Sequence, residues 1–296
     1  LQIVVDLGTV LTMLVRQKWL TIPASVRYTL GTAALVLAGI GVQQAMRVPP
    51  VKDIEVAIRD LPPQFDGYTM VQLTDMHISR LFDERWARAV VERSNALGAD
   101  LIVITGDLID GPVSARIRDV EPLRTLHAPD GVYVIPGNHE YFFDNEAWMQ
   151  HFASLGMTRL NNSHALIERG GAQLTLAGVT DLSAPHAGLP GPDLKQALAG
   201  APAQAPIILL DHQPRNARFS ATQGVALQLS GHTHGGMIRP LDLIIARANE
   251  GFVSGFYDVD GMQLYVNNGT ALWPGFALRL GVPSELTRIT LRRAQA

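Results

Sequence analysis

Five short polar motifs in this chain each come directly after an apolar run. They carry histidine, aspartate and asparagine, the residue types that bind metal ions or move protons. The motifs are Thr74-Asp75-Met76-His77, Gly106-Asp107-Leu108-Ile109-Asp110, Gly137-Asn138-His139-Glu140, Asp211-His212 and Gly231-His232-Thr233-His234. Five of the nine histidines fall inside these motifs. Scattered surface or core histidines would not gather in this way, so the motifs predict a single chemical site.

The residue types and their spacing favour a pair of divalent metal ions. Asp75 and His77 are two positions apart, as are His232 and His234, and side chains two apart on a strand point to the same side. Neutral imidazole and carboxylate suit Mn, Fe, Zn or Co. Two cations a few ångströms apart require a bridging anion, and Asp107 is the candidate. Glycines at positions 106, 137 and 231 permit sharp turns beside the metals.

Strands interleaved with helices are expected to position these motifs. Apolar runs typical of strands cover 54–58, 68–73, 101–104, 132–135, 174–179, 207–210, 225–229, 264–266 and 286–291. Helical spacing covers Glu84–Leu97 and Asn145–Leu155, and a short helix is expected to start near Asp193. Ligands of layered α/β proteins bind beyond the carboxyl ends of strands, where these motifs would meet. The fold class predicted is therefore α/β.

The ordered motif set resembles the calcineurin-like metallophosphoesterase superfamily. Its motifs D-x-H, G-D-x-x-D, G-N-H-E, H and G-H-x-H all occur in order across residues 75 to 234. The resemblance implies a layered α-β-β-α sandwich with a dinuclear site. It implies one metal held by Asp75, His77, Asp107 and His234. It implies a second metal held by Asp107, Asn138, His212 and His232, with His139 free of both metals and facing the leaving group.

The resemblance extends to a branch of that superfamily. His212-Gln213-Pro214, Gly235-Gly236 and the tail from Asn267 to Thr290 look like the membrane-anchored bacterial phosphodiesterases, which are akin to UDP-2,3-diacylglucosamine hydrolases. We expect a phosphodiester or pyrophosphate carried by a membrane lipid for three other reasons. The G-N-H-E motif supplies His139 for the leaving group, the short linker at residues 48–50 would hold the domain near the bilayer, and the apolar segment 272–276 could enter the headgroup region. Substrate specificity does not transfer with the motifs.

Several residues near the motifs keep two interpretations. Asp110 and Glu140 could orient a loop or a ligand histidine, and Asp211 is expected to be structural. Arg80 could meet a phosphate or simply face solvent. The aromatic residues that could wall a substrate pocket or pack in the core are Tyr141, Phe142 and Trp273.

The amino-terminal segment predicts a membrane anchor. Leu1 to Val15 is largely apolar, and Tyr28 to Met46 contains no charged residue. The second stretch would span nearly 30 Å as a helix, close to the hydrocarbon thickness of a bilayer. A buried helix of a soluble protein or a cleaved signal peptide are the alternatives. We expect a membrane anchor and linker over residues 1–50 and a metallophosphoesterase domain over residues 51–296.

The charges around this segment suggest an orientation. Arg16, Lys18 and Arg27 lie between the two apolar stretches, which favours a cytoplasmic connection and an extracytoplasmic catalytic domain at the cell membrane. Arg47 and Lys52 follow the second stretch and partly cancel this bias. The chain begins at Leu1 rather than at a methionine, which leaves the start of the natural protein open.

Composition narrows the functional classes. The formal net charge of the 296-residue chain is −3, so nothing indicates nucleic acid as a partner. The absence of cysteine excludes disulfides, zinc ribbons and thiol nucleophiles. We expect a hydrolase of phosphodiesters or pyrophosphates in which a metal-bridging hydroxide attacks phosphorus and His139 protonates the leaving group. The alternatives are a phosphomonoesterase or protein phosphatase, a nuclease, and a non-catalytic scaffold.

Overall fold

The computed structural model describes residues 2–17 and 22–294, with side chains described from Val5 onward. Lys18, one of the residues behind the predicted orientation, lies outside the described residues, as do Leu1 and residues 295–296.

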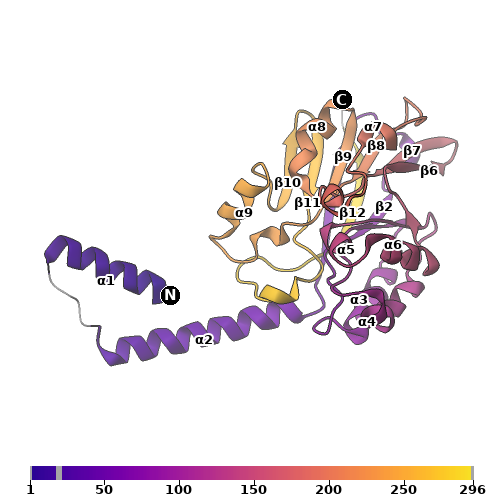
Figure 1. Ribbon diagram of the computed structural model, residues 1–296. Helices are drawn as coiled ribbons and strands as arrows, with labels where there is room; N and C mark the ends of the chain where they lie inside the picture. The colour runs from indigo at the N-terminus through magenta and orange to yellow at the C-terminus, as the bar shows by residue number, and fades with distance from the viewer. Residues whose placement is uncertain (1, 18–21, 295–296) are drawn as a thin grey trace.

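Two six-stranded mixed sheets pack face to face (Figure 1). The first has the order β1 (Val51–Ile58), β12 (Leu286–Arg293), β2 (Thr69–Leu73), β3 (Leu101–Thr105), β4 (Val132–Ile135) and β5 (Thr158–Arg159). The second has the order β10 (Gly255–Val259), β11 (Met262–Val266), β9 (Val225–Ser230), β8 (Ile207–Leu210), β7 (Ala172–Gly178) and β6 (Ser163–Arg169). Strands β2 to β5 run parallel to one another, as do β7, β8, β9 and β11.

Apolar side chains fill three layers around these sheets. The layer between the sheets joins residues of both, such as Val103, Leu210 and Leu229. The outer face of the first sheet is covered by α3 (Glu84–Asn95), α4 (Val113–Val120) and α6 (Asn145–Ser154). The outer face of the second sheet is covered by α7 (Leu194–Ala197) and α8 (Ala217–Thr222). The predicted α-β-β-α sandwich is confirmed.

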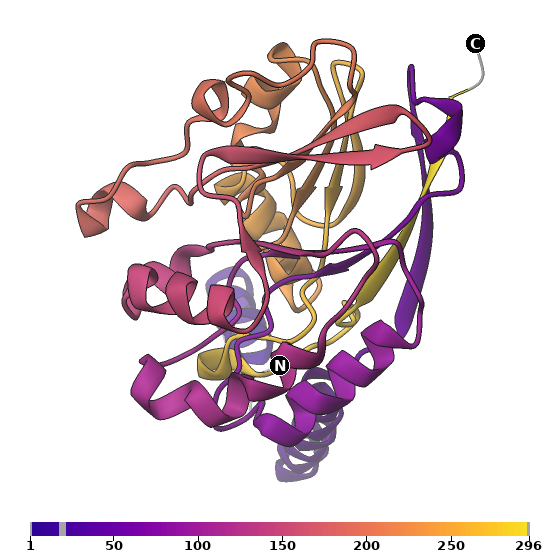
Figure 2. The same ribbon diagram turned by 90° about the vertical axis from the view of Figure 1, so that its right-hand side faces the viewer.

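Two helices precede the sandwich, α1 (Gln2–Arg16) and α2 (Ala24–Met46). Within the described residues, α2 is the one helix long and apolar enough to cross a membrane, and most of its surface is exposed. Its 23 residues at about 1.5 Å each span roughly 35 Å. Figure 1 shows α2 extending away from one side of the domain, and in Figure 2 it recedes behind the domain.

The connection from α2 to β1 is short and held in place. It comprises residues 47–50. Arg93 on α3 donates to the carbonyl oxygen of Pro49 at 2.7 Å and to that of Val48 at 3.3 Å. The last turns of α2 also touch the domain, since Gly41 and Ala45 are buried.

Candidate metal centre

The predicted motifs meet at one edge of the sandwich, beyond the carboxyl ends of strands from both sheets. The backbone there is left-handed at five non-glycine residues, with φ of 51° at Asp75, 44° at His77, 55° at Asp107, 69° at His232 and 50° at His234. Such conformations are costly and persist where the surrounding structure enforces them, often at functional sites. The spacing of two within each motif therefore does not reflect strand alternation, because both members lie past the strand end in turns.

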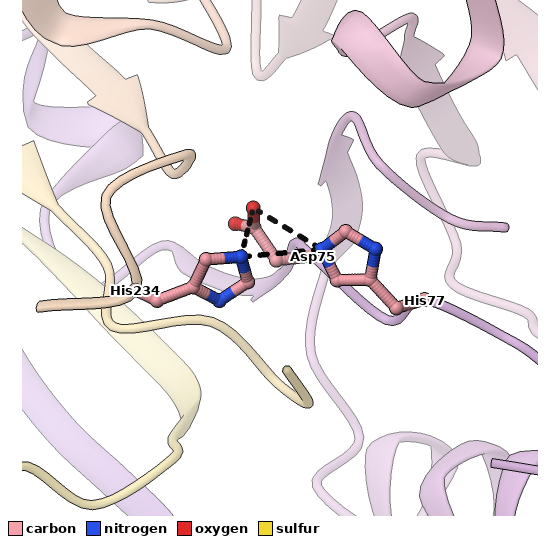
Figure 3. A group of neighbouring side chains, drawn as sticks. All are labelled: Asp75, His77 and His234. Carbon is pink, nitrogen blue, oxygen red and sulfur yellow. Dashed lines mark hydrogen bonds and ion pairs between the residues drawn. The ribbon is translucent and has the colours of Figure 1, made fainter. Parts of the chain in front are cut away.

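The first group of donor atoms comprises Asp75, His77 and His234, drawn in Figure 3. Nε2 of His77 lies 3.2 Å from Nε2 of His234. Oδ1 of Asp75 lies 3.6 Å from the same His234 nitrogen and 4.0 Å from that of His77. All three side chains point to a common position between them (Figure 3).

The second group comprises Asp107, Asn138, His212 and His232. Oδ1 of Asn138 lies 3.1 Å from Nε2 of His212 and 2.9 Å from Nδ1 of His232. Nδ1 of His212 lies 2.7 Å from the carbonyl oxygen of Thr105, which favours a proton on that nitrogen and leaves Nε2 free to bind a cation.

Asp107 lies between the two groups. Its Oδ2 is 3.8 Å from Nε2 of His77 and 3.3 Å from Nε2 of His212. One carboxylate oxygen thus approaches a ligand-type nitrogen of each group, which is the arrangement that a shared ligand requires.

His139 stands beside this centre and is held by Asp110. Its Nδ1 lies 2.5 Å from Oδ1 of Asp110, whose other oxygen lies 3.0 Å from Nδ1 of His77. Burial alone would lower the pKa of His139, but the bond to Asp110 and the charge of Asp107 outweigh it and raise this pKa to about 9. Of the two roles considered for Asp110, orienting a loop or orienting a histidine, these contacts support the second, because its carboxylate binds two histidine rings.

Glu140 and Gly137 shape the loop that carries Asn138. The Glu140 carboxylate accepts from the backbone N–H groups of Asp107 at 3.0 Å, Leu108 at 2.8 Å and Gly137 at 2.7 Å. A Cβ at Gly137 would overlap the Asp107 carboxylate. The two loops therefore pack backbone to backbone, which only glycine permits at this position.

The charge states of two ligand histidines suit divalent cations, whereas the charge of Asp107 raises the pKa of a third, His212, well above its usual value. Burial lowers the pKa of His232 to about 3, and burial together with His77 and Arg279 holds that of His234 well below its usual value. Both imidazoles are therefore neutral ligands. With a proton on Nδ1 toward Asp110, the Nε2 lone pair of His77 faces Nε2 of His234 at 3.2 Å. Two lone pairs that face each other repel, whereas a cation between them can be bound by both nitrogens. The donor set therefore fits metal ions.

The structure also locates the residues with open interpretations. Arg80 is exposed. The Phe142 side chain is exposed, with its ring centroid 5.2 Å from that of His139, so it lies at the rim of the site. Tyr141 lines a cavity of about 220 Å³ with Asn145 and Thr180.

One residue that the sequence did not single out supports the site. Arg279 is fully buried and donates to the carbonyl oxygens of His234 at 3.0 Å, Asn268 at 2.5 Å and Ala271 at 2.8 Å. These carbonyls belong to a ligand loop and to the loop beside Asp75. A single arginine in a loop carries no sequence pattern that would have identified it.

Comparison with known proteins agrees with this geometry. Residues 68–236 match the calcineurin-like phosphoesterase family. A zebrafish protein named transmembrane protein with metallophosphoesterase domain is 37% identical over 88% of this chain and 61% of its own length. The Bacillus subtilis uncharacterized metallophosphoesterase YkuE is 31% identical over 88% of this chain and 93% of its own length.

A cattle protein carries the same name as the zebrafish one. The chain spans about three fifths of the length of these two relatives, at 61% of each. Among solved structures, a dimetal phosphatase from zebrafish aligns with a TM-score of 0.46 and 14% identity, over 69% of this chain and 88% of that one.

Proposed function

The chain belongs to the calcineurin-like phosphoesterase family, whose match covers residues 68–236, and from this premise we propose that its dinuclear metal site hydrolyses phosphodiester or pyrophosphate bonds. The observation that carries the proposal is the convergence of both donor groups on Asp107, with His139 beside them. A non-catalytic scaffold would have no need to retain such a centre.

We assign one cation to Asp75, His77, Asp107 and His234, and the other to Asp107, Asn138, His212 and His232. The assignment is supported by the distances within each group and by the position of the Asp107 carboxylate. Imidazole, carboxylate and amide oxygen are compatible with Mn, Fe, Zn or Co. Bound there, two such cations supply an activated water and neutralise charge that develops on the phosphoryl oxygens.

His139 is the proposed proton donor to the leaving oxygen. Asp110 fixes its ring through Nδ1, which leaves Nε2 to face the centre, 3.9 Å from Oδ2 of Asp107. The bond to Asp110 raises the pKa of His139 and so favours the protonated imidazole that a general acid requires. Phe142 lies against the ring and shields one side of it from water.

A membrane lipid is the proposed carrier of the substrate. The support is the apolar helix α2, which we propose as a membrane span within an anchor over residues 1–50, followed by the catalytic domain over residues 51–296. Relatives with the same type of domain are named transmembrane. By the charge bias around Arg16 and Arg27 we place the catalytic domain outside the cytoplasm.

The test is a substrate panel with the full chain in detergent micelles. Rates are compared on bis(p-nitrophenyl) phosphate, on p-nitrophenyl phosphate and on a lipid-linked pyrophosphate, each with Mn, Zn, Fe or Co. We expect metal-dependent hydrolysis of the diester and the pyrophosphate to exceed that of the monoester. Preference for the monoester would support a phosphatase instead, and no hydrolysis with any metal would favour a scaffold.

A further inference from the structure

Two exposed apolar segments lie on the side of the domain from which α2 extends. The first is α9 (Asp242–Ala248) with the residue before it, and the second is the short turn η6 (Pro274–Phe276) with the residue before it. Figure 1 shows both segments on the α2 side of the domain. We define the apolar rim as five of their residues, which are Leu241, Leu243, Ile244, Trp273 and Phe276.

The apolar rim presents large side chains to solvent. Leu243 is 66% exposed and Ile244 is 65% exposed, while Trp273 is 46% exposed. Every residue of α9 is at least partly exposed. Exposed leucine and isoleucine side chains on a helix favour contact with an apolar environment. Exposed apolar patches of this kind often mark interaction sites.

One segment follows a loop that carries a metal ligand, and the other follows the loop beside Asp75. α9 follows His234 by only a few residues and packs on the turn η5 (His234–Gly236), so closely that a Cβ at Gly236 would overlap Asp242. The η6 turn follows Ala271, whose N–H donates to the carbonyl oxygen of Asp75 at 3.0 Å. The apolar rim is thus adjacent to the metal centre.

The loop that follows η6 packs against the last turns of α2. The backbone N–H of Arg279 donates to the carbonyl oxygen of Gly41 at 3.0 Å. The missing side chain of Gly41 makes room for Leu278, since a Cβ there would lie 2.9 Å from that side chain. The Arg279 guanidinium in turn holds the carbonyl of His234 at 3.0 Å. The end of α2, the η6 loop and a ligand loop therefore form one packed unit.

We propose that the apolar rim enters the headgroup region of the bilayer that α2 crosses, so that the mouth of the metal centre opens at the lipid surface. This inference rests on the membrane span of the proposed function. Leucine, isoleucine and tryptophan are favoured at that depth. Exposed Arg239 and Arg247 lie on either side of the α9 part of the rim in the sequence and suit anionic lipid phosphates, although Nε of Arg239 also lies 4.0 Å from Oδ2 of Asp242.

The test uses the natural absence of cysteine. The full chain is reconstituted in phosphatidylcholine–phosphatidylglycerol liposomes with one cysteine introduced as Ile244→Cys or Trp273→Cys and labelled with a nitrobenzoxadiazole dye. Lipids that carry a nitroxide near the headgroup should quench both labels. Leu166→Cys serves as the control, because Leu166 is 38% exposed on β6, at the opposite side of the domain (Figure 1). That label should keep its fluorescence.

Absence of quenching at both rim sites would overturn the proposal. A label that is shielded from water but not quenched would also overturn it, because a protein partner would then cover the rim. Hydrolysis of bis(p-nitrophenyl) phosphate, measured on the same samples, reports separately on the proposed function. The double variant Leu243→Asp and Ile244→Asp should lower the rate on a lipid-linked substrate by about tenfold and leave the rate on the soluble diester unchanged. An equal fall on both substrates would contradict a lipid contact.

Discussion

Asp107 is the residue shared by both groups of donor atoms, because its Oδ2 lies 3.8 Å from Nε2 of His77 and 3.3 Å from Nε2 of His212. Asp107→Asn keeps the size of the side chain and removes its charge. We expect metal content to fall below one ion per chain and turnover of bis(p-nitrophenyl) phosphate to fall at least about 100-fold. Elemental analysis and rate measurement check this. Asp60→Asn, on an exposed turn, is the control and should retain both. An Asp107→Asn protein with two bound ions would refute the bridging role.

His139 is expected to act on the leaving group rather than on the metals. His139→Ala should keep its metal content and lose about 10²–10⁴ in turnover of a diester with an alkoxide leaving group. A nitrophenolate leaves without a proton, so hydrolysis of the nitrophenyl ester should fall much less. Comparison of the two rates in one preparation measures the effect. If His139→Ala loses its metal, or slows both substrates equally, the general-acid role is wrong.

For individual residues, the sequence predicted which side chains are metal-ligand candidates better than it predicted which side chains contact one another. The metal-ligand candidates were readable because histidine and aspartate gathered in motifs after apolar runs. The role of Asp110 stayed open because its contacts to His77 and His139 depend on two loops meeting in space. Arg279 was missed for the same reason, since its partners are carbonyl groups, which carry no sequence signature.

Among the elements, one carboxylate links central strands of the first sheet to the edge strand β6 of the second. Asp100, just before β3, accepts from the N–H and hydroxyl groups of Thr69 on β2 and from Arg169 on β6. Burial would raise the pKa of Asp100, but these partners outweigh it and lower this pKa below its usual value. The stabilisation is therefore complete above the unfolded pKa of about 3.9 and is lost as the pH falls through the folded value.

Asp100→Asn tests this linkage. We expect the variant to lose about 1 kcal/mol of unfolding free energy at pH 7, a small figure because Asp100 is partly exposed, with 25% of its side chain accessible, and solvent screens its charge. The difference from the natural chain should shrink as the pH falls below about 4. Urea unfolding at several pH values provides the measurement, with Asp258→Asn on an exposed strand as the control. A difference that stays constant across this range would contradict the linkage.

Most strands that the sequence predicted have continuous apolar runs and became central strands of the two sheets, whereas β1 was predicted from its alternating pattern and lies at a sheet edge. The edge strands β5, β6 and β10 were missed because they are short or half exposed and lack a continuous apolar run. Helix α9 was missed because its leucine and isoleucine cover no core. Tertiary pairing, rather than local pattern, decides such elements.

At the scale of the whole molecule, the metal centre joins the two sheets. Asp75, His77 and Asp107 follow strands of the first sheet, whereas His212 and His232 follow strands of the second. Bound cations stabilise only the folded arrangement. Removal of metal with a chelator should lower Tm by roughly 5–10 °C, as expected for a ligand present well above its Kd in a domain of this size. Tryptophan fluorescence during heating measures the shift, and Asp107→Asn should not respond to the chelator.

The short connection between α2 and β1 has a kinetic consequence. Arg93 donates hydrogen bonds to the carbonyl groups of Val48 and Pro49, so the linker between α2 and the domain is fixed rather than flexible. With the proposed span of α2 in a bilayer and the proposed lipid-borne substrate, the enzyme meets its substrate by lateral diffusion in two dimensions. Its velocity then depends on the mole fraction of substrate among the lipids of its own vesicle, and dilution of the whole suspension leaves turnover per enzyme unchanged.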